Sequence, residues 1–382
     1  MERVYLDWNA TTPPCREAVE AFSEASRNHW GNASSLHQEG REAAALFDRT
    51  RDGLARWTRS RAGEWILTSG GTESVHAAIF GCLDARPSGG RIVSSQGEHA
   101  CTNGVLDQLQ ARGWEVVRVP LRADGTWDVQ EVVRACREAP TAMASLIWAN
   151  NETGAISDAA GLAVVLREAK IPLHLDAVQC FGKIEVDLQA VPADFVSLSG
   201  HKFQATKGMG ALRVRTGAPW SRWMQGGNQQ RARRGGTVDV AAAASLAAAI
   251  DRSGTHGFMD PQHRDELQAS LLHDVSGVRV VSGTARRLPN TLCIVVEGAD
   301  SSALLARMDE RGFAIASGSA CSTGSPDPSS VLLAMGIPEH LAHCAIRISF
   351  GWSTTPAQLA DFGRVFREEI DRVRSIMDGK TK

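Results

Sequence analysis

Residues 195–202 read FVSLSGHK, a short apolar run followed at once by a serine, a glycine, a histidine and a lysine. The run 195–198 has the length and the β-branched and aromatic content of a buried strand. The same combination of an apolar run and a polar cluster recurs upstream, where the clusters are SGGTE at 69–73, EHA at 98–100, NNETG at 150–154 and DAVQ at 176–179. The recurrence indicates that successive strands of one sheet end in polar residues.

Between about residue 60 and residue 215, short apolar runs alternate with longer stretches of helical periodicity. We expect strands at 65–68, 91–95, 115–119, 144–148, 173–175, 195–198 and 211–214. We expect helices at 73–83, 102–111, 129–138 and 159–169. This alternation is typical of a mostly parallel sheet covered by helices on both faces, which binds ligands beyond the carboxyl ends of its strands. The sequence therefore predicts an α/β fold with a seven-stranded sheet and a ligand site at its polar edge.

Beyond about residue 255 the pattern changes, and strands at 278–281, 291–296 and 345–349 are interspersed with helices, the last of which starts near Pro356. This pattern indicates a smaller α+β domain. We therefore expect a large domain over residues 15–255 and a small domain made of residues 1–14 and 256–382. Residues 317–330, SGSACSTGSPDPSS, are rich in Gly, Ser and Pro, which predicts a mobile loop in the small domain.

The composition excludes several classes of protein. The chain has 382 residues, with 41 Lys and Arg against 43 Asp and Glu, so no basic excess points to nucleic acid. No apolar run approaches the ~20 residues of a membrane span, and the N-terminus lacks the apolar segment of a signal peptide. We therefore expect a cytoplasmic protein that binds no membrane. The eight cysteines form no CxxC pair, so we expect no metal site.

Lysines are scarce, so a chemistry that needs a lysine has few candidates. Only six of the 41 basic residues are lysines. Lys202 follows a buried strand beside a serine and a histidine, where burial and a cationic neighbour can make an amine nucleophilic. By itself Lys202 could equally be a surface lysine in a loop. Lys207 is the one serious rival, because Lys170 and Lys183 read as charges at a helix end and in a loop, and the last two lysines lie in the C-terminal tail.

Three polar clusters together match the needs of pyridoxal phosphate. The segment Ser69–Glu73 joins a strand to a helix through two glycines, which favours an anion at the helix N-terminus, although the same residues form ordinary helix caps. It is neither a Walker A loop nor a GxGxxG fingerprint. Asp176 at a strand end could pair with a protonated ring nitrogen or could cap a helix. Together with Lys202 these residues supply a phosphate cradle, a carboxylate and a Schiff-base lysine. His99 and Asn151, by themselves, read as a structural histidine and a turn asparagine.

At the level of whole motifs, the chain resembles the cysteine desulfurases, which are fold-type-I pyridoxal-phosphate enzymes of the aminotransferase class V group. The resemblance extends from residue 5 to residue 351. The blocks that carry it are YLDWNATTP at 5–13, GNASSLHQEG at 31–40, TSGGTES at 68–74, EHA, NNETG, DAVQ, SGHK, the RRGGT block at 233–237, SGSACSTGSPDPSSVL at 317–332 and RISFG at 347–351. The long cysteine loop is similar to that of the nitrogen-fixation and iron–sulfur-cluster branch.

The resemblance implies a role for each matching residue. Lys202 would bind the cofactor covalently, His99 would stack on its ring and shuttle protons, and Cys321 would take the substrate sulfur as a persulfide. The implied cofactor-binding residues are Gly71, Thr72, Asn151, Asp176, Gln179, Ser199, His201 and, from the other subunit of a homodimer, Thr237. Asn151 and Arg347 would bind the carboxylate of the substrate L-cysteine. The sulfur would then pass to an acceptor protein.

The chain departs from the usual motifs at Val75 and His76, at Ala205 and Thr206, and at Asn228. The cofactor and nucleophile positions are intact, so these departures bear on substrate preference and on the partner. Within the same scaffold, a selenocysteine lyase or a class V aminotransferase is the alternative activity. A non-catalytic scaffold that binds a partner is the alternative from another class. The basic loop before Thr237 could also be an ordinary solvated loop and not a dimer contact.

Overall fold

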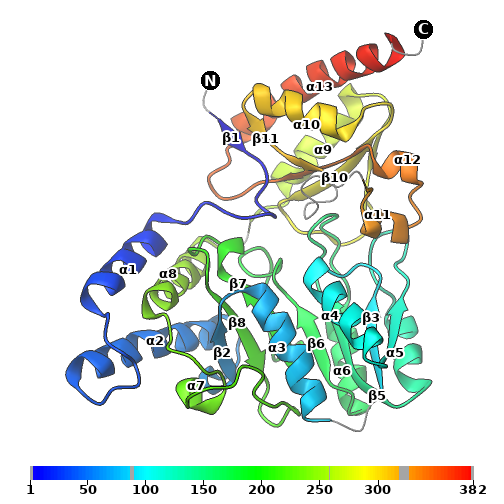
Figure 1. Cartoon of the computed structure of the whole chain (residues 1–382). Coiled ribbons are helices and arrows are strands. Elements are labelled where there is room, and N and C mark those ends of the chain that lie inside the picture. Colours follow the sequence, from blue (N-terminus) through cyan, green and yellow to red (C-terminus); the bar gives the residue numbers. More distant parts are fainter. Residues whose placement is uncertain (1–2, 87–89, 258, 318–326, 380–382) are drawn as a thin grey trace.

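A seven-stranded sheet forms the centre of the computed structural model, which describes residues 3–86, 90–257, 259–317 and 327–379 (Figure 1). The strand order is β2-β8-β7-β6-β5-β3-β4. The strands are β2 (Trp65–Thr68), β3 (Arg91–Ser95), β4 (Glu115–Val119), β5 (Thr141–Ile147), β6 (Leu173–Asp176), β7 (Phe195–Ser199) and β8 (Gly210–Val214). Only β8 runs antiparallel to its neighbours, β2 and β7, and all other pairs are parallel. The predicted seven-stranded, mostly parallel sheet is confirmed.

The central strands are buried along their whole length, which explains their nearly continuous apolar sequences. Every residue of β5, β6 and β7 is buried. The strand predicted at 144–148 begins earlier, at Thr141, because β5 already pairs there with Arg91 of β3. The other predicted strands of this sheet differ from the observed ones by at most one residue at an end.

Helices cover both faces of this sheet. On one face, α3 (Gly71–Asp84) and α4 (Ala100–Ala111) pack against the strands in one apolar cluster. On the other face, the cluster includes α5 (Val129–Arg137), α6 (Ala159–Glu168), α2 (Gln38–Trp57) and α8 (Val240–His256), with α1 (Arg16–Asn28) packed on α8. Asp side chains cap α5, α6 and α8 by accepting backbone N–H groups of the first turn. The helices therefore begin where their capping residues place them.

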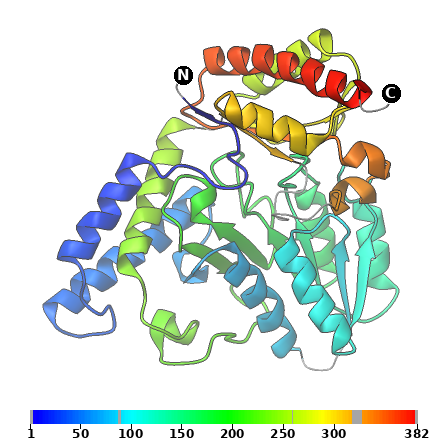
Figure 2. The same ribbon diagram turned by 45° about the horizontal axis from the view of Figure 1, so that its top comes forward.

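A second, smaller sheet lies beside the first and carries the C-terminal helices (Figure 2). Its antiparallel order is β12-β13-β10-β9. Its elements are β9 (Val278–Val280), β10 (Thr291–Val296), β12 (Ala316–Ser317), β13 (Ala345–Ser349), α9 (Gln262–Asp274), α10 (Ser301–Glu310), α11 (Ser330–Ala334), α12 (Glu339–Ala342) and α13 (Pro356–Gly379). The predicted α+β character of this region is confirmed. The predicted loop 317–330 is wrong at both ends, because Ser317 ends β12 and Ser330 starts α11, while residues 318–326 lie outside the described part of the chain.

The N-terminal segment joins the two sheets. Strand β1 (Val4–Tyr5) pairs in parallel with β11 (Phe313–Ala314) of the smaller unit. The chain then passes between the sheets, where the N–H of Trp8 donates to the carbonyl of Ser349 at 3.1 Å and the N–H of Thr12 donates to the carbonyl of His201 at 3.0 Å. The division into residues 15–255 and residues 1–14 with 256–382 stays a prediction. None of the described helices is both long enough and apolar enough to cross a bilayer.

Candidate active site

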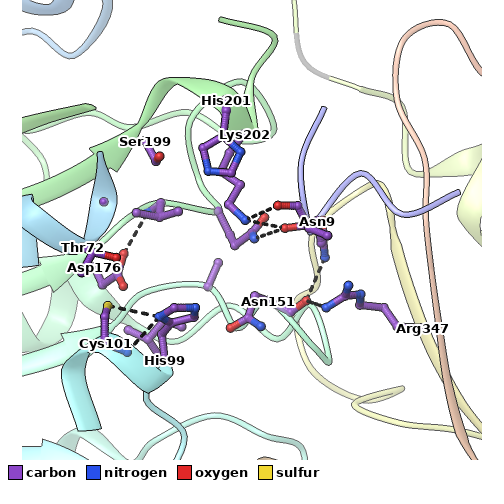
Figure 3. A pocket seen from close by; sticks show the side chains of 16 residues that line it. Asn9, Thr72, His99, Cys101, Asn151, Asp176, Ser199, His201, Lys202 and Arg347 are labelled. Carbon is purple, nitrogen blue, oxygen red and sulfur yellow. Dashed lines mark hydrogen bonds between the residues drawn. The ribbon is translucent and has the colours of Figure 1, made fainter. Parts of the chain in front are cut away.

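A cavity of about 260 Å³ lies at the carboxyl ends of β5, β6 and β7, beneath the N-terminal segment (Figure 3). Its lining consists of Asn9, Ala10, Gly71, Thr72, His99, Cys101, Ile147, Ala149, Asn151, Asp176, Val178, Gln179, Ser199, His201, Lys202 and Arg347. All of the predicted site residues except two are among them. Thr237 is exposed and lines no part of this cavity, and Cys321 lies outside the described residues. The fold thus gathers the polar strand ends into one pocket, close in size to the ~300 Å³ at which small-molecule sites begin.

One end of the cavity is suited to an anion. Helix α3 begins there at Gly71, so the N–H groups of its first turn have no partner within the helix and the helix dipole adds positive potential. A Cβ on Gly71 would meet a methyl carbon of Val178 at 2.9 Å, so glycine keeps this turn open. The hydroxyls of Thr72 and Ser199 border the same space (Figure 3).

His201 also borders the anion end, and it is held in place from outside the sheet. Its Nδ1 lies 3.0 Å from the hydroxyl of Thr11 in the N-terminal segment. Burial, and then the charge of Lys202, lowers the pKa of His201 to about 4. The imidazole is therefore neutral near neutral pH, so one ring nitrogen can donate a hydrogen bond and the other can accept one.

Asp176 supplies a buried carboxylate in the middle of the cavity. It ends β6 and is only 4% exposed. Its Oδ1 accepts the N–H of Val178 at 3.0 Å. Burial raises the pKa of Asp176, and electrostatic interactions with the neighbouring His99 and Lys202 oppose that shift. A cationic group bound beside this carboxylate would stabilise its charged form further.

His99 lies across the cavity from Lys202 and is fixed by its own helix (Figure 3). It is the N-cap of α4, and its Nδ1 accepts the N–H of Cys101 at 3.2 Å. The thiol of Cys101 lies 3.1 Å from the same nitrogen. Cys101 lies in the first turn of α4, and its half-buried side chain borders the cavity. A cysteine two residues after a cavity histidine is the signal that sequence reasoning passed over.

Lys202 points into the cavity, and a second lysine lies close by. The Nζ of Lys202 donates to the carbonyls of Asn9 at 2.8 Å and Ala10 at 2.7 Å. Lys183 was expected to be a loop charge, and this expectation is wrong, because Lys183 is only 4% exposed. Its Nζ donates to the side-chain oxygen of Asn9 at 2.9 Å and to that of Gln179. Lys207, the expected rival, is exposed.

Arg347 forms the wall of the cavity nearest the smaller sheet. It is fully buried on β13. Its two terminal nitrogens donate to the carboxylate of Asp7 at 2.6 Å and to the carbonyl of Asn151 at 3.2 Å. Its Nε is buried without a hydrogen-bond partner among the residues that the structure describes. A cation held in this way, with one donor unused, is suited to bind a carboxylate.

Glu98, next to His99, gives a prediction about stability. It is 4% exposed, and its Oε1 accepts the hydroxyl of Ser95 and the N–H of Ile147. Burial raises the pKa of Glu98 to about 8. The folded protein therefore holds a proton here that the unfolded chain releases above about pH 4.5, so this group makes stability fall as the pH rises from about 4.5 to about 8. We expect Glu98→Gln to reduce that fall.

The measurement is the thermal unfolding midpoint of Glu98→Gln and of the unaltered protein at about pH 5 and about pH 8. The variant should gain relative to the unaltered protein at the higher pH. The exposed residue Glu20, changed to Gln, serves as a control that should leave the pH dependence as it is. Equal pH dependence in the Glu98→Gln protein would contradict a proton on this carboxyl group.

Comparison with known proteins shows the family to which this chain belongs. Residues 4–362 match the aminotransferase class-V family. The chain is 39% identical over 380 residues to a cysteine desulfurase of Cereibacter sphaeroides, with 98% of both chains covered. Among solved structures, it is similar to a NifS-like protein, with a TM-score of 0.88, 26% identity, and 97% of this chain and 99% of that chain covered. It is also similar to a protein described as SspA in complex with cysteine, with a TM-score of 0.81, 28% identity, and 91% and 98% coverage. The resemblance found in the sequence motifs is confirmed, and the chain belongs to the aminotransferase class-V family.

Proposed function

We propose that this protein is a pyridoxal-phosphate-dependent cysteine desulfurase that converts L-cysteine to L-alanine and takes up the sulfur on Cys321 as a persulfide. The observation that carries the proposal is the convergence of Lys202, Asp176 and His99 on one cavity with an anion-binding end. Membership of the class V family implies the cofactor, and the similar proteins include a cysteine desulfurase and a structure with bound cysteine.

The residues present fit pyridoxal phosphate. The first turn of α3, with Thr72 and Ser199, would hold the phosphate, since it offers unpaired N–H groups and hydroxyls. Asp176 would pair with the protonated ring nitrogen, which would offset the burial of its carboxylate. Lys202 would attach the cofactor covalently, and Gln179 would donate to the phenolic oxygen. When bound, the cofactor acts as an electron sink that makes the substrate's α-proton acidic.

The protein's own residues then bind the substrate and move its protons. Arg347 and Asn151 hold the substrate carboxylate at the wall of the cavity nearest the smaller sheet. His99 would stack on the cofactor ring, and because its Nδ1 accepts the N–H of Cys101, the imidazole keeps one orientation. Lys202 carries protons to and from the substrate carbon atoms. Hydrogen bonds to neighbouring residues thus position Arg347, His99 and Lys202.

The sulfur step balances with the protein's own thiol. The Cβ–S bond of cysteine breaks, an S–S bond forms at Cys321, and Cβ gains a hydrogen, so that cysteine and a thiol become alanine and a persulfide. No external oxidant or reductant is required. The persulfide then passes to a sulfur-acceptor protein for iron–sulfur clusters or other thio-compounds. We place this activity in the cytoplasm, and we assign the cysteine loop to a small domain of residues 1–14 and 256–382.

The product identifies the reaction. Purified protein with pyridoxal phosphate, L-cysteine and a thiol reductant should form alanine and sulfide in equal amounts without any keto acid. A requirement for a keto acid would support a class V aminotransferase, and turnover of selenocysteine but not cysteine would support a selenocysteine lyase. A colourless protein that binds no cofactor would favour the non-catalytic scaffold and would overturn the proposal.

We also propose a homodimer in which Thr237 reaches the phosphate of the partner subunit. The loop before Thr237 is anchored on its own subunit, since Arg234 pairs with Glu73 at 2.9 Å and Gln230 exchanges two hydrogen bonds with the backbone of Leu67. Thr237 itself is exposed. Trp30, 72% exposed, and Leu36, 90% exposed, offer apolar surface for such a contact. Symmetric dimers are the commonest soluble oligomers.

Light scattering of the purified protein should therefore give twice the mass of the 41.0 kDa chain. Thr237→Ala should keep that mass but bind pyridoxal phosphate more weakly, because one phosphate contact is lost. A monomer that binds the cofactor at full strength would contradict both the dimer and the role of Thr237.

A further inference from the structure

Lys183 is a buried amine that the mechanism above does not use. It lies in the turn after β6, where the N–H of Cys180 donates to the carbonyl of Ala177 at 2.8 Å and the N–H of Lys183 donates to the carbonyl of Cys180 at 3.0 Å. These tight turns bring the lysine back beneath Gln179. At 4% exposure its Nζ is removed from water, and both of its hydrogen-bond acceptors are side-chain amide oxygens, those of Asn9 and Gln179.

This contact determines which way the amide of Gln179 faces. A lysine nitrogen donates hydrogen bonds, so the oxygen of the amide must face Lys183. On the other side, the amide nitrogen donates to the carbonyl of Asn9 at 2.9 Å, which can only accept. A flipped amide would set its oxygen against the carbonyl oxygen of Asn9, which loses that bond whatever the charge on Lys183, and it would set N–H against N–H when Lys183 is a charged ammonium. Gln179 lines the cavity, and its second N–H remains for whatever binds there.

The contact holds whether or not the amine is charged. Burial, and then the charge of Lys202, lowers the pKa of Lys183 well below its ordinary value. An uncharged amine still has two N–H groups, which is one for each amide oxygen that it contacts. The orientation of Gln179 therefore does not depend on a fixed positive charge beneath the cavity.

We propose that Lys183 is a positioning residue of the cofactor site, which acts by holding the Gln179 amide so that one N–H faces an anionic oxygen of the bound cofactor. This inference rests on the proposed function, since it concerns the same cavity. It gives Lys183 a role at the site that is not covalent. It also makes Asn9 a shared hydrogen-bond partner of Lys183, Gln179 and Lys202.

The test compares Lys183→Met, which keeps the length but removes the donor, with Lys207→Met at an exposed position. The dissociation constant of pyridoxal phosphate should be measured by titrating cofactor-free protein with pyridoxal phosphate. We expect about a tenfold weaker affinity for Lys183→Met, the scale of a lost partner for a buried polar group, and no change for Lys207→Met. The pH at which the visible band of the bound cofactor changes should shift in the same direction as in Gln179→Leu.

A double variant shows whether Lys183 acts through Gln179. Adding Lys183→Met to Gln179→Leu should weaken cofactor binding no further than the weaker of the two single variants. Additive losses, or a Lys183→Met protein that binds and titrates like the unaltered one, would overturn the inference. If Lys183→Met does not fold, Lys183→Gln is used in its place. The inference would then be overturned if Lys183→Gln binds the cofactor as weakly as Gln179→Leu does while the pH titration of its visible band stays unshifted. If the unaltered protein itself shows no visible band with pyridoxal phosphate, the proposed function fails and not this inference alone.

Discussion

Replacing Lys202 by alanine is expected to abolish desulfurase activity and the yellow colour of the holoenzyme. The reason is that Lys202 is the amine that points into the cavity, with Nζ held by the carbonyls of Asn9 and Ala10 at 2.8 and 2.7 Å. Without it the cofactor has no covalent attachment and the substrate has no amine to exchange protons with. Alanine formation should fall by at least about 10²–10⁴-fold, the scale of a lost proton-transfer group. The measurement is alanine release from L-cysteine, with the visible spectrum recorded in parallel.

Two other lysines test this assignment. Borohydride treatment of the holoenzyme should leave the cofactor on the peptide that contains Lys202. Label on Lys183, whose amine is buried nearby, or on the exposed Lys207, would contradict the assignment. Lys207→Ala should retain full activity and colour, so it is the matched control for loss of a lysine from the same segment.

Replacing Cys321 by serine is expected to separate cofactor chemistry from sulfur transfer. Binding of the cofactor needs Lys202 and the anion end of the cavity, so the variant should stay yellow and its spectrum should still change on addition of L-cysteine. Release of alanine and sulfide should fall by about 10²-fold or more, since the sulfur has lost its acceptor thiol and serine cannot form a persulfide. The measurement is the rate of alanine formation under a thiol reductant.

The thiol of Cys101 provides the discriminating control, because it borders the cavity and lies 3.1 Å from Nδ1 of His99. Cys101→Ser should release sulfide at a substantial rate if Cys321 is the acceptor. The opposite pattern, an active Cys321→Ser and an inactive Cys101→Ser, would contradict the role of Cys321 and assign the sulfur to Cys101. Cys344→Ser, away from the cavity, controls for general effects of removing a thiol.

The sequence predicts the large sheet and most of the cavity because both depend on local patterns. Buried parallel strands have continuous apolar runs, and polar residues at their carboxyl ends must meet at one edge of the sheet. The start of α4 was predicted two residues late, at Thr102, because histidine is an uncommon cap and His99 fulfils that role here. Hydrophobic periodicity therefore predicts correctly whether these elements are strands or helices. It does not predict a boundary that depends on a single side chain, such as the His99 cap of α4.

Lys183 and Asn9 could not be assigned from the sequence, because their roles depend on contacts between distant segments. A lysine in a Gly-containing loop is ordinarily solvated, whereas Lys183 is buried and bonds to Asn9 of the N-terminal segment. Asn9 bonds to Lys183, to Gln179 and to Thr291, which lie far apart in the chain. No local pattern encodes such a junction, so tertiary structure was required to find it.

The cavity beneath the N-terminal segment is assembled from parts of the chain that leave the ribosome at very different times. On one subunit, the anion end of the cavity is lined by Gly71, Thr72, Ser199 and His201, which are all translated before the smaller sheet. Arg347, which we propose to bind the substrate carboxylate, comes much later in the chain and pairs with Asp7, 340 positions earlier. Since domains generally fold as units during synthesis, we expect the anion end of the cavity to form before Arg347 is in place. A chain that stops before residue 347 would therefore carry the residues of the anion end without the guanidinium that we propose as the partner of the substrate carboxylate.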